Sequence, residues 1–340
     1  MEIIQIDTAD RRQARLFLDL PFRLYRDLPL WVPPLEGDAK LVLDRRRYPF
    51  YQHSDAAFFL ALEGGRALGR IAAIDNRNFN EFHKQRTGFF YLFECEDNPA
   101  ASEALFDAAC HWARERGLDR MWGPKGFTAL DGLGLLVKGF EFRPATGIPY
   151  NPPYYEKLVE AAGFKPLDDD VSGYIHARTY QFPEKIHELA ARVMARRGLR
   201  IARYRTKRDL MAIIPRLREL YNNSLGENYD QVPLTEAEMR LLADQILAIA
   251  DPKLIKIIMK GDEPVGFLLA YPNITAALQR TRGRLFPLGW LDLLLELKRT
   301  RVVDINGAGI LKEDQGLGGP AILFSELYKS VVEGRFDHAE

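Results

Sequence analysis

The 340-residue sequence predicts an α/β protein built from two similar domains in tandem. Three observations predict this class: strand-like and helix-like segments alternate, their order repeats along the chain, and the composition is globular. Apolar residues make up 47% of the chain and charged residues 28%, which excludes a wholly disordered protein. A chain of this length buries enough surface to fold without disulfides or a metal ion.

The first half contains apolar runs typical of strands, separated by segments with helical periodicity. Glycines at 64 and 65 lie between two such runs and predict a hairpin. The pair Asn98-Pro99 predicts a helix start, and Gly117 predicts the end of that helix. The predicted strands are 1–8, 56–62, 66–74, 88–95, 119–122 and 172–177, and the predicted helices are 9–26, 100–116 and 152–162.

The second half begins after a predicted helix at 183–197, which ends at Gly198, and then follows the same order. We therefore predict a first domain at 1–178, a connecting helix at 179–198 and a second domain at 199–340. The predicted strands of the second half are 200–205, 254–259, 265–270 and 302–310, and the predicted helices are 210–224, 235–250, 285–297 and 321–332.

Charge and cysteine content exclude several classes of protein. The 47 basic residues are balanced by 47 acidic ones, which argues against a nucleic-acid binder. The two cysteines, Cys95 and Cys110, and the six histidines have no metal-ligand spacing, so we expect no metal site. The N-terminus has no signal-peptide core, and the apolar stretch 285–297 is too short to span a bilayer. We expect a cytoplasmic protein without an integral membrane segment.

A glycine-rich segment at 309–321 lies between a predicted strand and a predicted helix. The first amides of a helix lack partners inside the helix, and glycines there let a phosphate approach them closely. The segment resembles the signature of the GNAT acetyltransferases, in which Arg or Gln precedes a pair of glycines. Gln315 corresponds to the Arg/Gln position, and Gly316 and Gly318 correspond to the glycines. Pro320 departs from the signature, because proline removes one amide donor.

The resemblance extends over nearly the whole chain, to a bacterial family of tandem GNAT-like proteins. It implies two domains with mixed central sheets flanked by helices. The matching strings are Trp31-Val-Pro-Pro, Pro49-Phe-Tyr, Gly69-Arg-Ile-Ala-Ala, Gly123-Pro, Gly139-Phe, Tyr150-Asn-Pro-Pro-Tyr-Tyr, Leu220-Tyr-Asn-Asn-Ser, Val232-Pro-Leu-Thr-Glu, Pro264-Val-Gly-Phe and Tyr271-Pro-Asn.

The resemblance also implies a co-substrate, acetyl-CoA or another acyl-CoA. Gly309 and Ile310 would then contact pantetheine, and a backbone amide at a strand bulge would stabilise the oxyanion. Asp304 is the candidate base, although it could equally face water. The residues expected to hold the pyrophosphate are Gln315, Gly316, Leu317, Gly318 and Gly319.

Four residues of the first half are candidates for binding the acceptor: Tyr150, Asn151, Tyr154 and Tyr155. Prolines 152 and 153 stiffen this segment and hold phenols at a loop, where such groups often contact ligands. The alternative is a rigid helix start with packed rings. The Tyr that often acts as an acid in this superfamily is replaced by Val159, so no acid is assigned.

The loop of the first half that corresponds to the glycine-rich segment reads Cys95-Glu-Asp-Asn-Pro-Ala-Ala. It has no glycine, and the carboxylates of Glu94, Glu96 and Asp97 would repel a pyrophosphate. We expect that the first domain has lost CoA binding and serves as a scaffold or binds the acceptor.

The second half poses a further question, because only eight residues follow the predicted helix 321–332. The resemblance implies another strand, a helix and a hairpin. We therefore expect the second domain to lack its C-terminal part and one of two parallel strands that form the CoA cleft. The strand 302–310 would then have an unpaired edge, which favours strand addition and a homodimer.

Three functions remain open. The first is acyl transfer from acyl-CoA to the primary amine of a small molecule, inactive if the second domain is incomplete. The second is a non-catalytic protein that binds a small molecule or an assembly partner on a GNAT scaffold. The third, suggested by the apolar insert 285–297, is transfer of a long acyl chain to a lipid amine. We expect the insert to pack in the core or at a domain interface, rather than on lipid as an interfacial helix.

Overall fold

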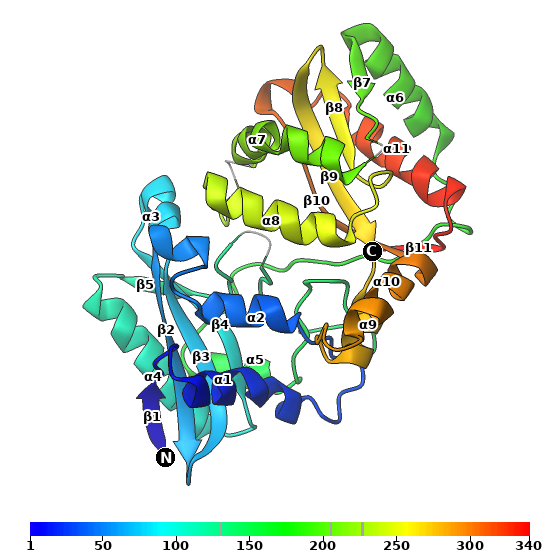
Figure 1. The fold of residues 1–340 in the computed structure, drawn as a ribbon. Coiled ribbons are helices and arrows are strands. Elements are labelled where there is room, and N and C mark those ends of the chain that lie inside the picture. Colours follow the sequence, from blue (N-terminus) through cyan, green and yellow to red (C-terminus); the bar gives the residue numbers. More distant parts are fainter. Residues whose placement is uncertain (129–130, 205, 226–227) are drawn as a thin grey trace. The chain divides into compact units, whose positions relative to one another are not determined.

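A computed structural model describes residues 1–128, 131–204, 206–225 and 228–340 (Figure 1). These residues form two compact units. Unit 1 comprises Met1–Asp170 and Thr275–Asp292, and unit 2 comprises Val171–Ile274 and Leu293–Glu340. The domains predicted from the sequence, with boundaries at 178 and 198, differ from this division and stay a prediction.

Unit 1 contains a mixed sheet in which the described strands follow each other in chain order. The first three pairings are antiparallel, and the last, between β4 and β5, is parallel. The strands are β1 (Glu2–Gln5), β2 (Asp55–Glu63), β3 (Arg66–Asp75), β4 (Thr87–Cys95) and β5 (Arg120–Trp122).

Helices cover both faces of this sheet. Phe17 of the first helix packs edge-on against Phe58, with ring centroids 5.4 Å apart, on one face. On the other face, Leu105 and Phe106 of α4 join the buried core. The helical segments of unit 1 are α1 (Arg11–Leu24), α2 (Glu36–Leu43), the 3₁₀ turn η1 (Pro49–Gln52), α3 (Arg77–His83), α4 (Pro99–Glu115), α5 (Tyr155–Ala161) and α9 (Thr275–Thr281).

Unit 2 contains a second mixed sheet, with the strand order β6-β11-β10-β9-β8-β7 among the described residues. The pairings from β7 to β10 are antiparallel, and β10 pairs with β11 in parallel. The strands are β6 (Ile175–His176), β7 (Leu199–Ile201), β8 (Lys256–Lys260), β9 (Glu263–Pro272), β10 (Val302–Ile310) and β11 (His338–Ala339).

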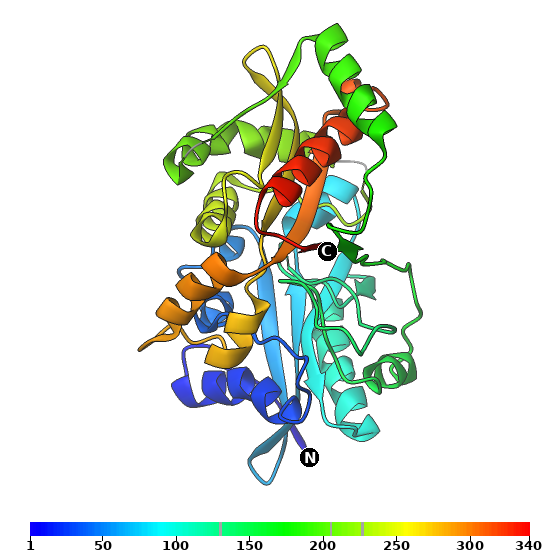
Figure 2. The same ribbon diagram turned by 90° about the vertical axis from the view of Figure 1, so that its right-hand side faces the viewer.

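The helices of unit 2 also lie on the two faces of its sheet. Leu268 packs with Ile322 and Leu323 of α11, whereas Phe267 on the other face approaches Tyr221 of α7, with ring centroids 6.1 Å apart. In Figure 2, α6 and α11 lie side by side. The helical segments are α6 (Glu184–Arg197), α7 (Lys207–Ser224), α8 (Glu236–Ile249), η2 (Lys312–Asp314) and α11 (Gly319–Glu333). A further helix, α10 (Gly289–Arg299), crosses from the segment of unit 1 into unit 2.

The two sheets share one plan. Counted from β1 in unit 1 and from β7 in unit 2, two α-helices separate the first two strands, the first four strands pair antiparallel in chain order, and an α-helix leads from the fourth strand to a parallel fifth. Unit 2 adds β6, which pairs antiparallel with β11. The predicted fold class, two α/β units with mixed sheets flanked by helices, is confirmed. Each fourth strand also has a bulge: Asn306 interrupts the pairing of β10 with β9, and β4 shifts register against β3 near Leu92, whose φ is 51°.

The expectation that unit 2 would lack its second parallel strand is wrong. The short strand β11 pairs in parallel with Val302 and Val303. The amide of Ile305 also donates to the carbonyl of Glu340 at 2.6 Å, and the amide of Glu340 donates to the carbonyl of Val303 at 2.9 Å. The start of β10 is therefore paired on this side, and a homodimer formed through the rest of the edge stays a prediction.

Several boundaries differ from the predictions. The predicted strand 172–177 is reduced to β6, and the predicted strand 200–205 becomes β7. Residue 205, its last position, lies outside the described residues. The predicted helix 152–162 begins at Tyr155, after the two prolines, and the predicted helix 285–297 begins at Gly289, after Pro287.

Candidate functional site

The glycine-rich turn connects the end of β10 to the start of α11. Gly309 and Ile310 are the last residues of β10 and pair with Phe267 and Gly266 of β9. The side chain of Ile310 belongs to the buried core. The short helix η2 then leads to Gln315, whose side-chain amide donates to the carbonyl of Ile310 at 3.0 Å and closes the turn.

The amides after Gln315 are available to a ligand. The amide of Gln315 itself donates to the carbonyl of Lys312 at 3.2 Å. Within the described part of the chain, the amides of Gly316, Leu317, Gly318 and Gly319 donate no hydrogen bond. The N-cap of α11 is Gly318, which has no side chain to bond the first amides of the helix. Consecutive free amide donors at a helix N-terminus are an arrangement in which proteins often bind anions.

The backbone of this turn needs its glycines. Gly316 and Gly318 have φ values of 69° and 89°, in the left-handed region that side chains disfavour. A Cβ on Gly318 would lie 2.9 Å from Val193 of α6, so the turn packs closely against that helix. The start of the turn is also held in place, because the buried carboxylate of Asp314, the last residue of η2, pairs with the ammonium of Lys260 at 3.1 Å.

The same position in unit 1 is closed. The side chain of Asn98 accepts the amide of Ala101 at 3.1 Å, and Pro99 at the helix start has no amide to offer. The backbone of Cys95 at the end of β4 is bonded by two phenols. Tyr155 accepts the amide of Cys95 at 3.0 Å, and Tyr154 donates to its carbonyl at 2.8 Å.

Two of the carboxylates next to the turn between β4 and α4 have partners within the protein, which the sequence did not indicate. Glu94 is largely shielded from solvent, with a side chain 13% exposed, and it accepts the hydroxyls of Tyr25 and Tyr155, each at 2.7 Å. Glu96 is paired with Arg23 and Arg66. Of the three carboxylates expected to repel a pyrophosphate, Glu94 and Glu96 are therefore engaged by partners within the protein, and repulsion by Asp97 stays a prediction. Hydrogen bonds by the protein itself occupy this position.

Glu94 is the centre of a buried network that joins β3, β4 and α5. Its carboxylate lies 3.7 Å from the guanidinium of Arg70, which donates to the carbonyl of Phe17 at 2.7 Å. Burial raises the pKa of Glu94, although Arg70 and the hydroxyls of Tyr25 and Tyr155 act in the opposite direction. Burial also raises the pKa of Tyr155 well above its ordinary value, so this phenol stays protonated.

The four predicted acceptor-binding residues all have protein partners. Tyr154 and Tyr155 hold the Cys95 backbone, as described above. Tyr150 donates to the carbonyl of Phe140 at 3.0 Å. Asn151 accepts the amide of Leu136 at 2.7 Å and donates to its carbonyl at 3.2 Å. These residues lie in unit 1, whereas the glycine-rich turn lies in unit 2.

Asp304, the candidate base, lies on β10 two residues before the bulge. It is 2% exposed, and both of its carboxylate oxygens accept the side-chain amide of Asn273, at 2.8 and 3.1 Å. Tyr271 lies opposite Asp304 on β9, and burial, together with the charge of Asp304, raises the pKa of this phenol. The side-chain oxygen of Asn306 is buried and has no partner among the described residues.

Sequence reasoning missed the roles of these three neighbours of Asp304. Tyr271 and Asn273 were part of a matching string to which no role was assigned, and Asn306 gave no signal. A bulge depends on the pairing of two strands, so a single segment does not reveal it.

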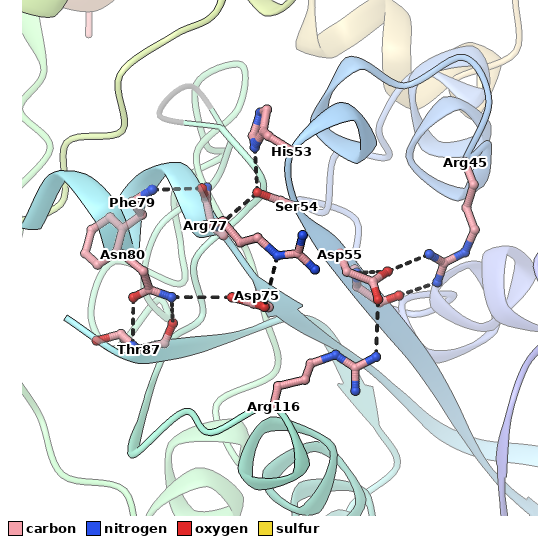
Figure 3. Close-up of polar contacts among 12 residues, drawn as sticks. Arg45, His53, Ser54, Asp55, Asp75, Arg77, Phe79, Asn80, Thr87 and Arg116 are labelled. Atoms are coloured by element: carbon pink, nitrogen blue, oxygen red, sulfur yellow. Dashed lines mark hydrogen bonds and ion pairs between the residues drawn. The ribbon is translucent and has the colours of Figure 1, made fainter. Parts of the chain in front are cut away.

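A second polar cluster lies at the opposite end of the sheet of unit 1 (Figure 3). Asp55 at the start of β2 pairs with Arg45 at 2.6 Å and with Arg116 at 3.2 Å. Burial would raise the pKa of Asp55, but these arginines and the Ala56 amide hold it below its ordinary value. Asp75 accepts the side-chain amide of Asn80 at 3.4 Å. The cluster ties strand ends to neighbouring helices, and no metal-binding group of three His, Cys, Asp or Glu occurs among the described residues.

No known family model matches the chain. A curated protein described as a bacterial ceramide synthase, from Caulobacter vibrioides (strain NA1000 / CB15N), is 31% identical over 303 residues, which cover 88% of this chain and 77% of that protein. The chain belongs to the family of this bacterial ceramide synthase. Protein YghO of Escherichia coli (strain K12) is 28% identical over 289 residues, which cover 85% of this chain and 73% of YghO.

Solved structures confirm the fold of this member of the bacterial ceramide synthase family. A tandem GNAT protein from the clavulanic acid biosynthesis pathway aligns with 99% of the chain and 88% of its own length, with a TM-score of 0.51 and 12% identity. A glucosamine N-acetyltransferase region of a fungal multi-domain β-N-acetylglucosaminidase aligns with 99% of the chain and 35% of its own length, with a TM-score of 0.51 and 14% identity. The predicted resemblance to tandem GNAT proteins is confirmed.

Proposed function

We propose that the chain is an N-acyltransferase that transfers a long acyl group from a coenzyme A thioester to the amine of a lipid. The observation that carries this proposal is the row of open amides from Gly316 to Gly319, at the end of a bulged strand. Membership of the bacterial ceramide synthase family favours a lipid amine, because a ceramide is a long-chain amino alcohol acylated on nitrogen.

Unit 2 supplies the surfaces that a CoA thioester requires. The open amides and the positive end of α11 would bind the pyrophosphate. The parallel pairing of β10 with β11 stops at Val303, so β10 has no described strand partner on that side from Asn306 to Ile310. The main chain there is the proposed partner of pantetheine, and it leads from the turn back to the bulge.

The proposed reaction needs positioning more than acid or base strength. The amine nitrogen forms a bond to the acyl carbon, the carbon–sulfur bond breaks, and the proton lost by the amine ends on the released thiol. The bulge turns a backbone amide of β10 out of the ladder, where it can stabilise the oxyanion. Asp304 is the proposed proton acceptor, and the side-chain oxygen of Asn306 is the proposed acceptor for a hydrogen bond from the amine.

The first unit has a different proposed role. The tyrosine hydroxyls on Cys95 and the Asn98 cap occupy the backbone groups that would otherwise bind a co-substrate. We therefore assign the thioester to unit 2 and propose that unit 1 is a scaffold. The alternative to a lipid amine and a long acyl group is acetyl transfer from acetyl-CoA to the amine of a small molecule.

Leu317 allows a direct test, because it lies in the turn without the left-handed backbone of its glycine neighbours. Leu317→Glu puts a carboxylate beside the open amides, and Leu317→Gln is its neutral match of the same shape. Two unit charges about 6 Å apart repel by roughly 0.7 kcal/mol in water and roughly 3 kcal/mol at the effective dielectric of a protein surface, a range that includes a tenfold loss of affinity. Calorimetry with CoA and a long-chain acyl-CoA should show about tenfold weaker binding to the Glu variant than to the Gln variant.

Equal affinity of the two Leu317 variants would contradict the site. Binding of acyl-CoA without transfer to any amine would instead favour a non-catalytic binding protein. Absence of binding by the wild-type chain would leave only a scaffold role.

A further inference from the structure

The helix α10 presents its apolar side to solvent. None of its residues is buried, in contrast to the expectation that the insert 285–297 packs in the core or at an interface. Trp290 is 46% exposed and Leu294 is 48% exposed. The exposed apolar surface, which we call the α10 ridge, consists of Phe286, Leu288, Trp290, Leu291, Leu294 and Leu295.

An ordinary surface helix exposes its polar side, whereas α10 exposes its apolar side. At 100° per residue, Trp290, Leu291, Leu294 and Leu295 fall on one side of the helix. The acidic residues Asp292 and Glu296 fall on the opposite, less exposed side. Asp292 is also paired with Arg280, at 3.0 Å. No carboxylate therefore interrupts the exposed side of the helix.

The turn before α10 extends the same surface. Phe286 is 85% exposed and Leu288 is 67% exposed, which is unusual for side chains of this size. The chain around the ridge carries exposed cations at both ends, Arg282 and Arg284 before it and Lys298 and Arg299 in the last turn of the helix. An apolar strip with basic ends matches a bilayer surface, where apolar groups meet acyl chains and cations meet anionic headgroups.

We infer that the α10 ridge docks the protein on the surface of a bilayer that contains anionic lipids. The helix lies in the interface and does not cross it, since its 11 residues extend about 16 Å. None of the described helices is long and apolar enough to cross a bilayer. Trp290, with its indole amide bonded to the carbonyl of Pro287 at 3.1 Å, is the side chain best suited to the headgroup boundary.

Docking there would also explain how a lipid amine reaches β10, a consequence that rests on the proposed function. The amide of Thr300 extends α10 by donating to the carbonyl of Glu296 at 2.8 Å, and β10 starts at Val302. In Figure 2, α10 leads directly into β10. The bulge at Asn306 lies four residues, or about 13 Å, further along the strand. The bilayer would therefore be at one end of β10 and the CoA turn at the other.

The test measures docking without any need for activity. The full chain is sedimented with vesicles of phosphatidylcholine alone and of phosphatidylcholine with phosphatidylglycerol. We expect binding to the second kind and about tenfold weaker binding for Leu294→Asp. The matched control is Leu167→Asp, which places the same charge at an exposed leucine of unit 1 and should bind as the wild type does. Lys298→Glu should weaken binding to vesicles that contain phosphatidylglycerol. It should not change binding to vesicles of phosphatidylcholine alone, which we expect to be weak for the wild type.

Wild-type binding that is equal with and without phosphatidylglycerol, or equal losses in the Leu294 and Leu167 variants, would overturn the inference. A dimer in solution that dissociates on Leu294→Asp would also overturn it, because a second copy would then cover the ridge. If the vesicles bind as expected but no lipid amine is acylated, docking stands and the proposed function fails.

Discussion

At the scale of single residues, the two units differ at the N-cap of one helix. Asn98 in unit 1 has a side chain that accepts a free amide, whereas Gly318 in unit 2 has none. An Asn cap stabilises a helix by about 1 kcal/mol, and a Gly cap leaves the same donors for a ligand. The glycine-rich pattern made this difference visible in the sequence. The part played by Tyr155 was not visible, because its partners Glu94 and Cys95 are about sixty residues away along the chain.

Tyr155→Phe tests whether that phenol has a structural role. The change leaves the buried carboxylate of Glu94 and the amide of Cys95 each without one partner. We expect a loss of about 2 kcal/mol in the free energy of unfolding, measured by urea denaturation, with unchanged affinity for CoA. Tyr150→Phe, which removes a single hydrogen bond in a half-buried position, is the control and should cost less.

A large loss of acceptor affinity in Tyr155→Phe, with stability intact, would contradict the structural role. It would restore the alternative in which this residue binds substrate.

At the scale of elements, β10 shows what a sequence pattern reveals and what it leaves out. The run of apolar residues correctly predicted a strand at 302–310, and the glycines correctly predicted a turn and a helix after it. The bulge at Asn306 and the pairing with β11 were not predictable, because both depend on partner strands and β11 has only two residues. Likewise, the periodicity of 285–297 predicted an amphipathic helix, but periodicity does not tell which side faces solvent.

Deletion of Asn306 tests the bulge. Because Ile305 and Gly307 pair with adjacent residues of β9, removing the residue between them keeps the register on both sides. We expect a folded protein with a free energy of unfolding within about 2 kcal/mol of the wild type and with unchanged CoA affinity. We expect at least a hundredfold lower rate of acyl transfer, because the backbone donor is lost.

The matched deletion is Leu92, whose left-handed backbone lies at the register shift of β4 in unit 1. It should leave catalysis intact if the protein folds. Retention of full activity on deletion of Asn306 would exclude the bulge from the reaction.

At the scale of the whole molecule, one order of strands and helices occurs twice. The helix start after the fourth strand is closed by side chains in unit 1 and has open amides in unit 2. The order of strands and helices in both halves was predictable from hydrophobic periodicity and from the turn residues. The assignment of 275–292 to unit 1 was not, because it depends on contacts far apart in the sequence, such as the amide of Glu36 with the carbonyl of Gly283 at 2.9 Å. The balanced total charge also concealed the basic ends of the α10 ridge, which depend on where the charges lie.

The central claim is that the turn after β10 binds the pyrophosphate of the acyl-CoA during N-acylation. The most direct measurement is mass spectrometry of the amide formed from a long-chain acyl-CoA and a long-chain amino alcohol on phosphatidylglycerol-containing vesicles, at acyl-CoA concentrations below saturation. We predict an N-acyl product with the wild-type chain and with Leu317→Gln, and about tenfold less product with Leu317→Glu. Equal product from the two Leu317 variants, or no product from the wild-type chain, would contradict the claim.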